Sequence, residues 1–568
     1  MTRRCPTACL ALRLAGIGLA ALGFAAAATA APSSVNGLIV KLRERPADAV
    51  PEVDARLARV LRVAGLAARG RHLGVRSRHV DFGARLSREE AQRLALRLAE
   101  SPEVEWVVPN ERERRLDVPQ DPRFAASYQG SGQWWLFPAG GSNANDIEER
   151  RRGVPGVQNA WTTSHGSAAA VVAVLDTGIT AHPDLTQGVL PGRDFVSTVE
   201  YANDGDGWDD DPSDPGDWVN GADRTANPAL FGDCDEADSS WHGTAIAGML
   251  AADTNNGIGV AAINWNGRVL PVRVAGKCGA DVADIVAGMR WAAGLAVAGV
   301  PRNPNPARVV SISFGGSAAC NAAYQDAIDE LAAKGVVVVA AAGNEHGAVT
   351  RPASCRGVVG VAALNRDGFK ASYSNFGAAV KIATVGGDPR DIGEWGIDLG
   401  DDGLLTVGNG GRMAPGRPDY TREAGTSFAA PAVSGVIGLM LSANPSLSVA
   451  QIIDGLQRSA RPHVLVPRMP SCSERNSGRC VCTTATCGAG ILDAAGAMAY
   501  ALAPDSYVAP NRQPEVVDNA DIDRAFKQDG GGGGALGAGW LAALALAVAA
   551  LSRRRPRSRA RAPAGAGR

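Results

Sequence analysis

The chain has 568 residues, of which 45% are hydrophobic and 20% are charged, so it is long enough for two or more folding units of ordinary globular composition. Its formal net charge of −1 hides a strong segregation, because residues 117–534 carry 30 Lys and Arg against 46 Asp and Glu. An acidic central segment argues against nucleic acid as a partner, since phosphate binding needs a basic face.

The N-terminus has the three parts of a secretory signal. Arg3 and Arg4 precede an apolar stretch over residues 10–28, and small residues close it at Ala28-Thr29-Ala30. We therefore expect residues 1–30 to be a signal peptide, the alternative being a retained membrane anchor. Export would place the chain where cysteines oxidise, so its even number of cysteines predicts disulfides.

Residues 31–116 have the pattern of a small α+β unit. Strands are expected at 37–42 and 104–108. Ser87 and Glu90 form a capping box before a helical run over 91–98. The polar, basic stretch that follows, up to residue 116, predicts a cleavage linker.

Residues 117–503 alternate between apolar strands and helical runs. The strands are rich in β-branched residues, and a helical run such as 322–334 lies between them; the clearest strands are 171–175, 309–313, 336–341 and 358–362. This alternation predicts an α/β fold with a doubly wound, mostly parallel sheet and helices on both faces. Reactive groups in such a sheet lie just beyond the carboxyl ends of the strands.

The C-terminal part changes character twice. Residues 504–534 form a polar and Gly-rich linker, residues 535–552 are apolar, and residues 553–568 form a basic tail. The apolar run 535–551 has seventeen residues, which span about 25 Å as a helix, the short end of a membrane-spanning helix. The Arg cluster behind them fits a cytoplasmic stop better than the alternative, a buried terminal helix.

Three motifs carry the groups that a serine needs to hydrolyse a peptide: a nucleophile, a base and a residue that orients the base. Asp176 ends an apolar strand, and His242 opens a helix of small residues. Ser427 stands at the start of a Gly- and Ala-rich helix, at the positive end of its dipole. Alone, each has a plainer interpretation, as a turn aspartate, a structural histidine or an N-cap serine.

With these motifs in the order Asp, His, Ser, the chain resembles the subtilisin-like serine proteases over roughly residues 120–500. The resemblance implies a secreted serine endopeptidase that hydrolyses polypeptides through an acyl-enzyme intermediate. It implies Asn344, in Ala341-Ala-Gly-Asn344, as a donor to the oxyanion, together with the backbone N–H of Ser427. It also implies a set of residues that bind the substrate: Ser313, Phe314, Gly315, Gly316, Ala341, Ala342 and Gly343.

The same resemblance extends to the flanking segments. Residues 31–116 are similar to the family's inhibitory propeptide, which would act as an intramolecular inhibitor. The tail is similar to a Gly-Gly sorting signal that an intramembrane protease cleaves, so a sorting machinery is an expected partner and transient anchoring at the membrane or cell surface is expected. We expect a monomer.

The chain departs from the family pattern at three positions that carry no chemistry. Ala245 stands where the family commonly has His, Phe428 where it has Met, and Ala432 where it has His. These changes leave the fine substrate preference open, although Glu345, next to Asn344, hints at tolerance for basic side chains. Two alternatives also stay open: a pseudoprotease that only binds, and a membrane-tethered processing enzyme with one substrate.

A dense acidic stretch predicts structural Ca²⁺. Residues 203–217 hold seven aspartates, and hard cations take several oxygens from closely spaced carboxylates; a solvated acidic loop is the alternative. The expected ligands are Asp204, Asp206, Asp209, Asp211 and Asp214. A second candidate calcium site consists of Asp184 and residues 254–260, which resemble a calcium loop of the family.

Eight cysteines lie in the central segment. Cys234 precedes His242 and Cys278 follows an expected strand, so both should lie at one end of the sheet and pair. A bond between Cys320 and Cys355 would close a loop around the specificity pocket. The remaining four then pair among themselves in one of three ways, or the cluster of Cys480, Cys482 and Cys487 binds a metal; the four are Cys472, Cys480, Cys482 and Cys487.

Overall fold

The computed structural model describes residues 34–46, 48–110, 118–125, 132–140, 150–388, 400–467 and 469–517. It divides the chain into two compact units, Met1–Arg115 and Leu116–Arg568, next to the boundary predicted at 116–117. The predicted signal peptide, most of the cleavage linker, and everything after residue 517 lie outside the described residues.

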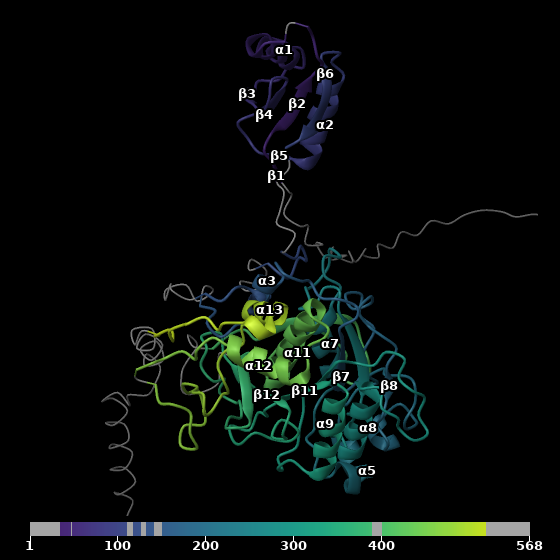
Figure 1. Ribbon diagram of the computed structural model, residues 1–568. Coiled ribbons are helices and arrows are strands. Elements are labelled where there is room, and N and C mark those ends of the chain that lie inside the picture. Colours follow the sequence, from purple (N-terminus) through teal and green to yellow (C-terminus); the bar gives the residue numbers. More distant parts are fainter. Residues whose placement is uncertain are drawn as a thin grey trace, which may run out of the picture. The chain divides into compact units, whose positions relative to one another are not determined.

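The first unit is a four-stranded antiparallel sheet with two helices (Figure 1). The strands follow the spatial order β3 (Arg69–His72), β4 (Ser77–Asp81), β2 (Leu38–Leu42), β6 (Val104–Pro109). The helices are α1 (Val50–Val63) and α2 (Arg88–Ala99), and a short pair joins β1 (Ser34–Val35) to β5 (Leu86–Ser87). Alternate residues of β2 are buried, and the predicted capping box of Ser87 and Glu90 starts α2.

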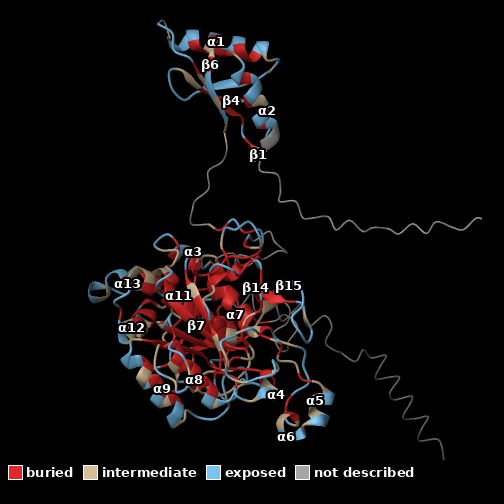
Figure 2. Cartoon of the chain, turned by 90° about the vertical axis from the view of Figure 1, so that its right-hand side faces the viewer, coloured by how far each residue is buried: buried red, intermediate tan, exposed pale blue. Residues whose placement is uncertain are grey.

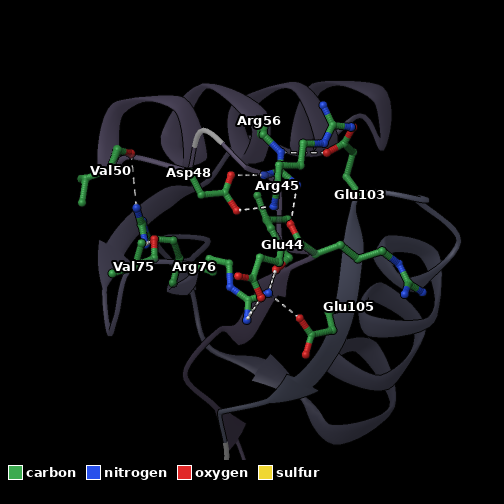
Figure 3. A network of polar contacts seen from close by, with 12 residues as sticks. Glu44, Arg45, Asp48, Val50, Arg56, Val75, Arg76, Glu103 and Glu105 are labelled. Atoms are coloured by element: carbon green, nitrogen blue, oxygen red, sulfur yellow. Dashed lines mark hydrogen bonds and ion pairs between the residues drawn. The ribbon is translucent and has the colours of Figure 1, made fainter.

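A polar network ties α1 of this unit to its sheet (Figure 3). The Arg56 guanidinium is buried between the carboxylates of Asp48 and Glu103, and it donates to the carbonyl oxygen of Arg43 at 2.8 Å. A buried cation is tolerated because two carboxylates and a carbonyl surround it. The unit therefore has its own apolar core and its own buried ion pairs.

The second unit is built on a seven-stranded parallel sheet (Figure 1). The spatial order is β13 (Val380–Val385), β12 (Val359–Leu364), β11 (Val337–Ala341), β10 (Val309–Ile312), β7 (Val171–Asp176), β9 (Arg268–Arg273), β8 (Arg193–Asp194). Every pairing between these strands is parallel.

Helices cover both faces of this sheet, and β7 has apolar residues on both of its sides for them to bury. Its residues Val172 and Val174 join one core cluster, whereas Ala173 and Leu175 join the other. The helices α7 (His242–Ala251) and α11 (Thr426–Ala443) pack on the first face; α8 (Val282–Ala292) and α9 (Ala322–Ala333) pack on the second. Figure 2 shows this buried interior. The predicted α/β doubly wound fold is confirmed.

The direction of winding reverses at β7. From β7 the chain adds β9 on one side, and later adds β10 and the strands after it on the other. Ligands bind at such a switch point, outside the carboxyl ends of the strands. Asp176 is the last residue of β7 and lies at this point.

The remaining described elements are peripheral to the sheet. An antiparallel hairpin of β14 (Leu404–Asn409) and β15 (Pro418–Glu423) lies beside α7. The short helices are α3 (Val157–Ala160), α4 (Val199–Ala202), α5 (Gly221–Ala226) and α6 (Pro228–Phe231); α12 (Val449–Ser459) and α13 (Ala494–Leu502) follow α11, and 3₁₀ turns lie at Trp134–Leu136 and Pro504–Ser506.

Within the described residues, only α11 is long and apolar enough to cross a membrane. This helix packs against β10, β11 and β12, and 83% of its most apolar window is buried inside the fold. Its apolar character is therefore that of a core helix. The span predicted at 535–552 lies outside the described residues.

Four disulfides cross-link the second unit. Cys234 bonds to Cys278 and Cys320 bonds to Cys355, the two pairings predicted from the spacing. The pairings left open are Cys472–Cys480 and Cys482–Cys487. The sulfurs of Cys472, Cys482 and Cys487 lie within 4.8 Å of one another, but as disulfide sulfurs they are not the thiolates that a metal needs.

Candidate active site

A carboxylate and an imidazole meet at the end of β7. Asp176 is 1% exposed, and its Oδ1 accepts hydrogen bonds from Nδ1 of His242 at 2.7 Å and from the N–H of Thr177 at 2.9 Å. The His242 side chain is 22% exposed, so the ring reaches from the buried carboxylate toward solvent. With Nδ1 as the donor, Nε2 is left as the basic nitrogen.

The Asp176–His242 contact requires α7 to begin very close to β7. A Cβ on Gly243 would lie 2.2 Å from the carbonyl oxygen of Gly178, so only glycine fits there. Trp241 precedes the helix in a left-handed conformation (φ 51°) and is anchored by its indole N–H, which donates to Gly411 at 2.7 Å. Backbone strain held by surrounding contacts is typical of a functional site.

The pKa of His242 responds to this environment. Burial opposes the charged imidazolium, but the charge of Asp176 and its hydrogen bond outweigh burial, with help from Glu423 and Asp217. The pKa of His242 is therefore raised above its ordinary value. A more basic imidazole suits a group that must take a proton from a hydroxyl.

Ser427 lies on the first turn of α11, where it is the second helical residue and not the N-cap. Its hydroxyl donates to the carbonyl oxygen of Ser313 at 2.7 Å, and the Ser313 hydroxyl donates back to the carbonyl oxygen of Ser427 at 2.8 Å. The next residue, Phe428, packs edge-on against the His242 ring with centroids 5.4 Å apart. The residue that follows the serine thus contacts the histidine ring, and the serine hydroxyl is turned toward Ser313.

Asn344 lies just after β11 and faces the same helix start. Its Oδ1 accepts from the N–H of Thr426 at 3.0 Å and from the Thr426 hydroxyl at 2.8 Å, which leaves Nδ2 to point the other way. A Cβ on Gly425 would lie 3.6 Å from this Nδ2 and 3.5 Å from the N–H nitrogen of Ser427. Two donors therefore border one small space, as in a site that stabilises an oxyanion.

The predicted substrate edge follows β10. Ser313 is engaged with Ser427 as described, and Phe314 and Gly315 continue the segment. Gly316, however, exchanges two backbone hydrogen bonds with Arg351, at 3.0 and 3.2 Å. The backbone of Gly316 is therefore already paired within the fold.

The loop after β11 forms the opposite side of the predicted substrate site. Ala341 and Ala342 are buried, and the carbonyl oxygen of Ala342 accepts from both the N–H and the hydroxyl of Thr350. Gly343 has φ +107°, which glycine alone adopts readily. The loop is therefore held by its backbone hydrogen bonds and by the conformation of Gly343.

The five aspartates predicted to bind calcium do not converge. Within the part of the chain that the structure describes, the converging group of His, Cys, Asp or Glu ligand atoms contains none of them. Asp209 accepts from the N–H of Asp211 at 2.9 Å, and Asp211 accepts from that of Ser213 at 3.0 Å. The stretch folds as successive tight turns, and the structure does not assemble Asp204, Asp206, Asp209, Asp211 and Asp214 into one site.

Two of these aspartates have other partners. Asp204 pairs with the buried Arg273, which also pairs with the fully buried Asp194. Asp214 accepts from the Thr177 hydroxyl at 2.7 Å, and that hydroxyl in turn accepts from the N–H of Gly243 at 3.1 Å. Asp214 thus supports the start of α7 next to His242, a role that spacing did not predict.

The second calcium candidate looks different, because its carboxylates are buried. Asp184 accepts from the Val260 N–H at 2.8 Å and from the Asn256 amide at 2.7 Å; Asp121 accepts from the Asn255 N–H at 2.9 Å. Burial raises the pKa of Asp184 to about 7 and that of Asp121 to about 6, and the charge of Asp121 adds to the effect on Asp184. Two buried carboxylates beside one loop fit a divalent cation by donor chemistry. Sequence analysis missed Asp121, which lies far from the loop in the chain.

The segment 218–241, here called the insertion because it lies between the acidic loop and α7, precedes the histidine. It contains α5 and α6, and the Cys234–Cys278 disulfide fastens it to the segment after β9. Ser239 donates to the carbonyl oxygen of Met413 on the tip of the β14–β15 hairpin, and Arg412 pairs with Asp238. The insertion and the hairpin tip thus brace each other beside His242.

The fold and the geometry define an α/β protein in which a carboxylate-paired histidine contacts the first turn of a helix that carries a serine. A family model described as the subtilase family, Peptidase S8, matches residues 167–496. The chain belongs to the subtilase family, and the resemblance inferred from the three motifs is confirmed.

Individual relatives support the assignment to this family. An "Extracellular protease" of Xanthomonas campestris is 36% identical over 420 residues, covering 73% of this chain and 63% of that protein. An "Extracellular basic protease" of Dichelobacter nodosus is 35% identical, covering 74% and 62%. The chain therefore spans a little under two thirds of each of these relatives. A solved protease structure from Pseudoalteromonas arctica is 39% identical with a TM-score of 0.56, covering 67% of this chain and 99% of that one.

Proposed function

We propose that the protein is a secreted serine endopeptidase whose triad is Asp176, His242 and Ser427. The observation that carries this proposal is the 2.7 Å contact between Asp176 and His242 next to a serine on a helix start. The two donors that border one space, Asn344 Nδ2 and Ser427 N, support it independently. The relatives named as extracellular proteases support both the activity and the secretion.

The reaction would proceed by acyl transfer. The Ser427 hydroxyl turns from Ser313 to His242 and attacks the peptide carbonyl carbon while His242 takes its proton. His242 then gives that proton to the leaving amine, and water repeats the sequence to release the acid. Asp176 holds the imidazole in the right tautomer and stabilises its charged form.

Asn344 and the N–H of Ser427 would bind the oxyanion that forms in each step. Removing one such donor typically costs roughly 2.7–4 kcal/mol of barrier. The substrate would pair as an extended strand with residues 313–315 on one side of the site. Ala341, Ala342 and Gly343 would line the other side.

The flanking segments complete the proposal. The first unit would act as a propeptide that inhibits the enzyme until it is cleaved off, an assignment supported by its independent core and by the family. The C-terminal residues 535–568 would be a sorting tail that anchors the chain transiently.

We also propose that structural Ca²⁺ binds at Asp184 and Asp121 with the loop 254–260. Bound there, the cation would neutralise two buried carboxylates and fix the N-terminal segment of the second unit to this loop. No catalytic step depends on it. The support is the burial of both carboxylates; of the seven aspartates in the acidic loop 203–217, Asp214 alone is buried.

Labelling with a fluorophosphonate tests the triad, since only an activated serine reacts. We expect Ser427→Ala to abolish labelling and to lower kcat by a factor on the order of 10⁶, the size of loss that follows removal of a triad serine. The matched control is Ser442→Ala on the same helix, whose hydroxyl donates to Gly438, and it should label normally. A wild-type chain that folds but does not label would instead indicate a pseudoprotease.

A further inference from the structure

Asn375 is a fully buried amide directly beneath the loop that carries Asn344. It lies in the turn that follows β12. Its Nδ2 donates to the carbonyl oxygen of Ala342 at 3.2 Å and to the Glu345 carboxylate at 2.6 Å. Its Oδ1 accepts from the N–H groups of Glu345, at 3.0 Å, and Gly347, at 2.8 Å.

This one side chain therefore uses its full hydrogen-bonding capacity on a single loop. Its backbone N–H adds a fifth bond, to the carbonyl oxygen of Gly343 at 2.9 Å. The contact is close, since a Cβ on Gly343 would lie 2.3 Å from Asn375 Nδ2. The residues bonded to Asn375 stand on both sides of Asn344 in the chain.

Asn344 is consequently held at two points. Thr426 fixes the direction of its side-chain amide, and Asn375 fixes the backbone on which that amide stands. The hydrogen bonds to Thr426 orient the amide only if the Asn344 backbone stays at the right distance from α11. The position of the oxyanion donor thus depends on a buried group that does not touch it.

We propose that Asn375 is a positioning residue for the oxyanion donor and that it acts on catalysis through Asn344. The inference rests on the proposed role of Asn344. A donor must lie about 2.7–3.1 Å from the position of the oxyanion, so a small shift of the loop weakens transition-state binding while ground-state binding changes little. The expected signature is a loss in kcat with KM nearly unchanged.

Asn375→Asp is the informative variant, because it keeps the two acceptor bonds and removes both donor bonds. It also places a second carboxylate against that of Glu345. We expect kcat to fall by a factor on the order of 10–100, as for a small misplacement of a catalytic group. Adding Glu345→Gln supplies an amide donor to the new carboxylate and should restore part of kcat.

A double-mutant cycle with Asn344→Ala separates positioning from general stability. Once Asn344 is truncated, Asn375→Asp should lower kcat no further, because the group through which it acts is gone. A peptide aldehyde, whose hemiacetal oxygen occupies the oxyanion position, should bind more weakly to Asn375→Asp, whereas a product peptide should bind equally. Each variant is processed in trans by wild-type enzyme, so its own activity does not limit maturation.

Asn303→Asp is the matched control. Asn303 is also a buried amide that donates to two carbonyl oxygens, those of Trp291 and Ala292 at the end of α8, on the other face of the sheet. It should change the melting temperature without changing kcat. If Asn375→Asp does not fold, Asn375→Ala takes its place, because it removes the side-chain amide without adding charge.

Three results would overturn the inference: an unchanged kcat in Asn375→Asp, a loss in the Asn344→Ala background as large as in the wild type, or an equal kcat loss in Asn303→Asp. If Asn344→Ala alone leaves kcat unchanged, the assigned oxyanion donor is wrong, and that failure is distinct from these three.

Discussion

Two acidic regions of the second unit handle their charge in opposite ways. The loop 203–217 is dense in aspartate, yet its carboxylates are spread over successive turns, and Asp204 is neutralised by Arg273. Asp121 and Asp184 are far apart in the chain, but both are buried and both accept hydrogen bonds from the loop 254–260. On the proposed assignment, the burial of carboxylates, and not their density in the sequence, marks the calcium site.

The largest loss of stability should follow removal of the Arg273 guanidinium, which pairs with Asp204 of the acidic loop. Arg273→Leu leaves the fully buried Asp194 without its cation, and breaking such a buried pair costs about 3–5 kcal/mol. We expect a loss of that size in the free energy of unfolding, measured with denaturant in a Ser427→Ala background that cannot digest itself.

The double variant Arg273→Leu with Asp194→Asn should recover part of the lost stability, since no buried charge is then left unpaired. If Arg273→Leu is neutral, or if added calcium restores it fully, a bound metal ion and not the guanidinium neutralises the acidic loop, and the contrast between the two regions fails.

Calcium bound at Asp121 and Asp184 should contribute less to the free energy of unfolding than Arg273 does. A ligand that binds only the folded state at 100 times its Kd stabilises by about 2.7 kcal/mol, so EDTA should lower the melting temperature. Asp184→Asn should abolish this response to EDTA.

The control for the calcium effect is Asp206→Asn together with Asp211→Asn in the acidic loop, which should leave the response to EDTA intact. The reverse pattern, with the response lost in the loop variant and kept in Asp184→Asn, would move the calcium site to the acidic loop.

The smallest effect should be on the pH dependence of activity. Asp217, at the end of the acidic loop, is one of the charges that raise the pKa of His242. Catalysis needs the neutral imidazole, so kcat/KM is lost as the pH falls through this pKa. Asp217→Asn removes a negative charge, lowers the pKa of His242, and should shift the acid limb of the kcat/KM profile to lower pH.

Asp184→Asn serves as the comparison and should leave the acid limb in place. Salt should shrink the shift caused by Asp217→Asn, because mobile ions screen partly exposed charges. An equal shift in both variants would show that the two acidic regions act on the histidine alike.

The sequence was sufficient for features that are local in the chain. Buried strands such as Val171–Asp176 are continuous apolar runs, and the capping box at Ser87 is a four-residue pattern, so both could be recognised without a structure. Asp176, His242 and Ser427 each end a strand or begin a helix, which is why topology alone predicts that they lie at the same end of the sheet.

What the sequence did not predict depends on contacts between distant segments. The hydrogen bond from the Thr177 hydroxyl to Asp214 could not be predicted from the neighbours of Asp214 in the chain. Asp121 and Asn375 belong to no motif, because their roles come from the loops against which they fold. A side chain that serves a remote loop leaves no periodic or spaced signal.

The bond between Cys234 and Cys278 closes a covalent ring that contains His242, all of α7 and the exposed turn from Asn255 to Ile258. A single cut by another protease molecule at that turn would open the ring without releasing either piece. Both fragments would stay joined through the sulfur bridge, and the histidine would keep its covalent connection to the sheet. In the proposed secreted protease, the ring would keep a chain that had been cut at this turn covalently joined.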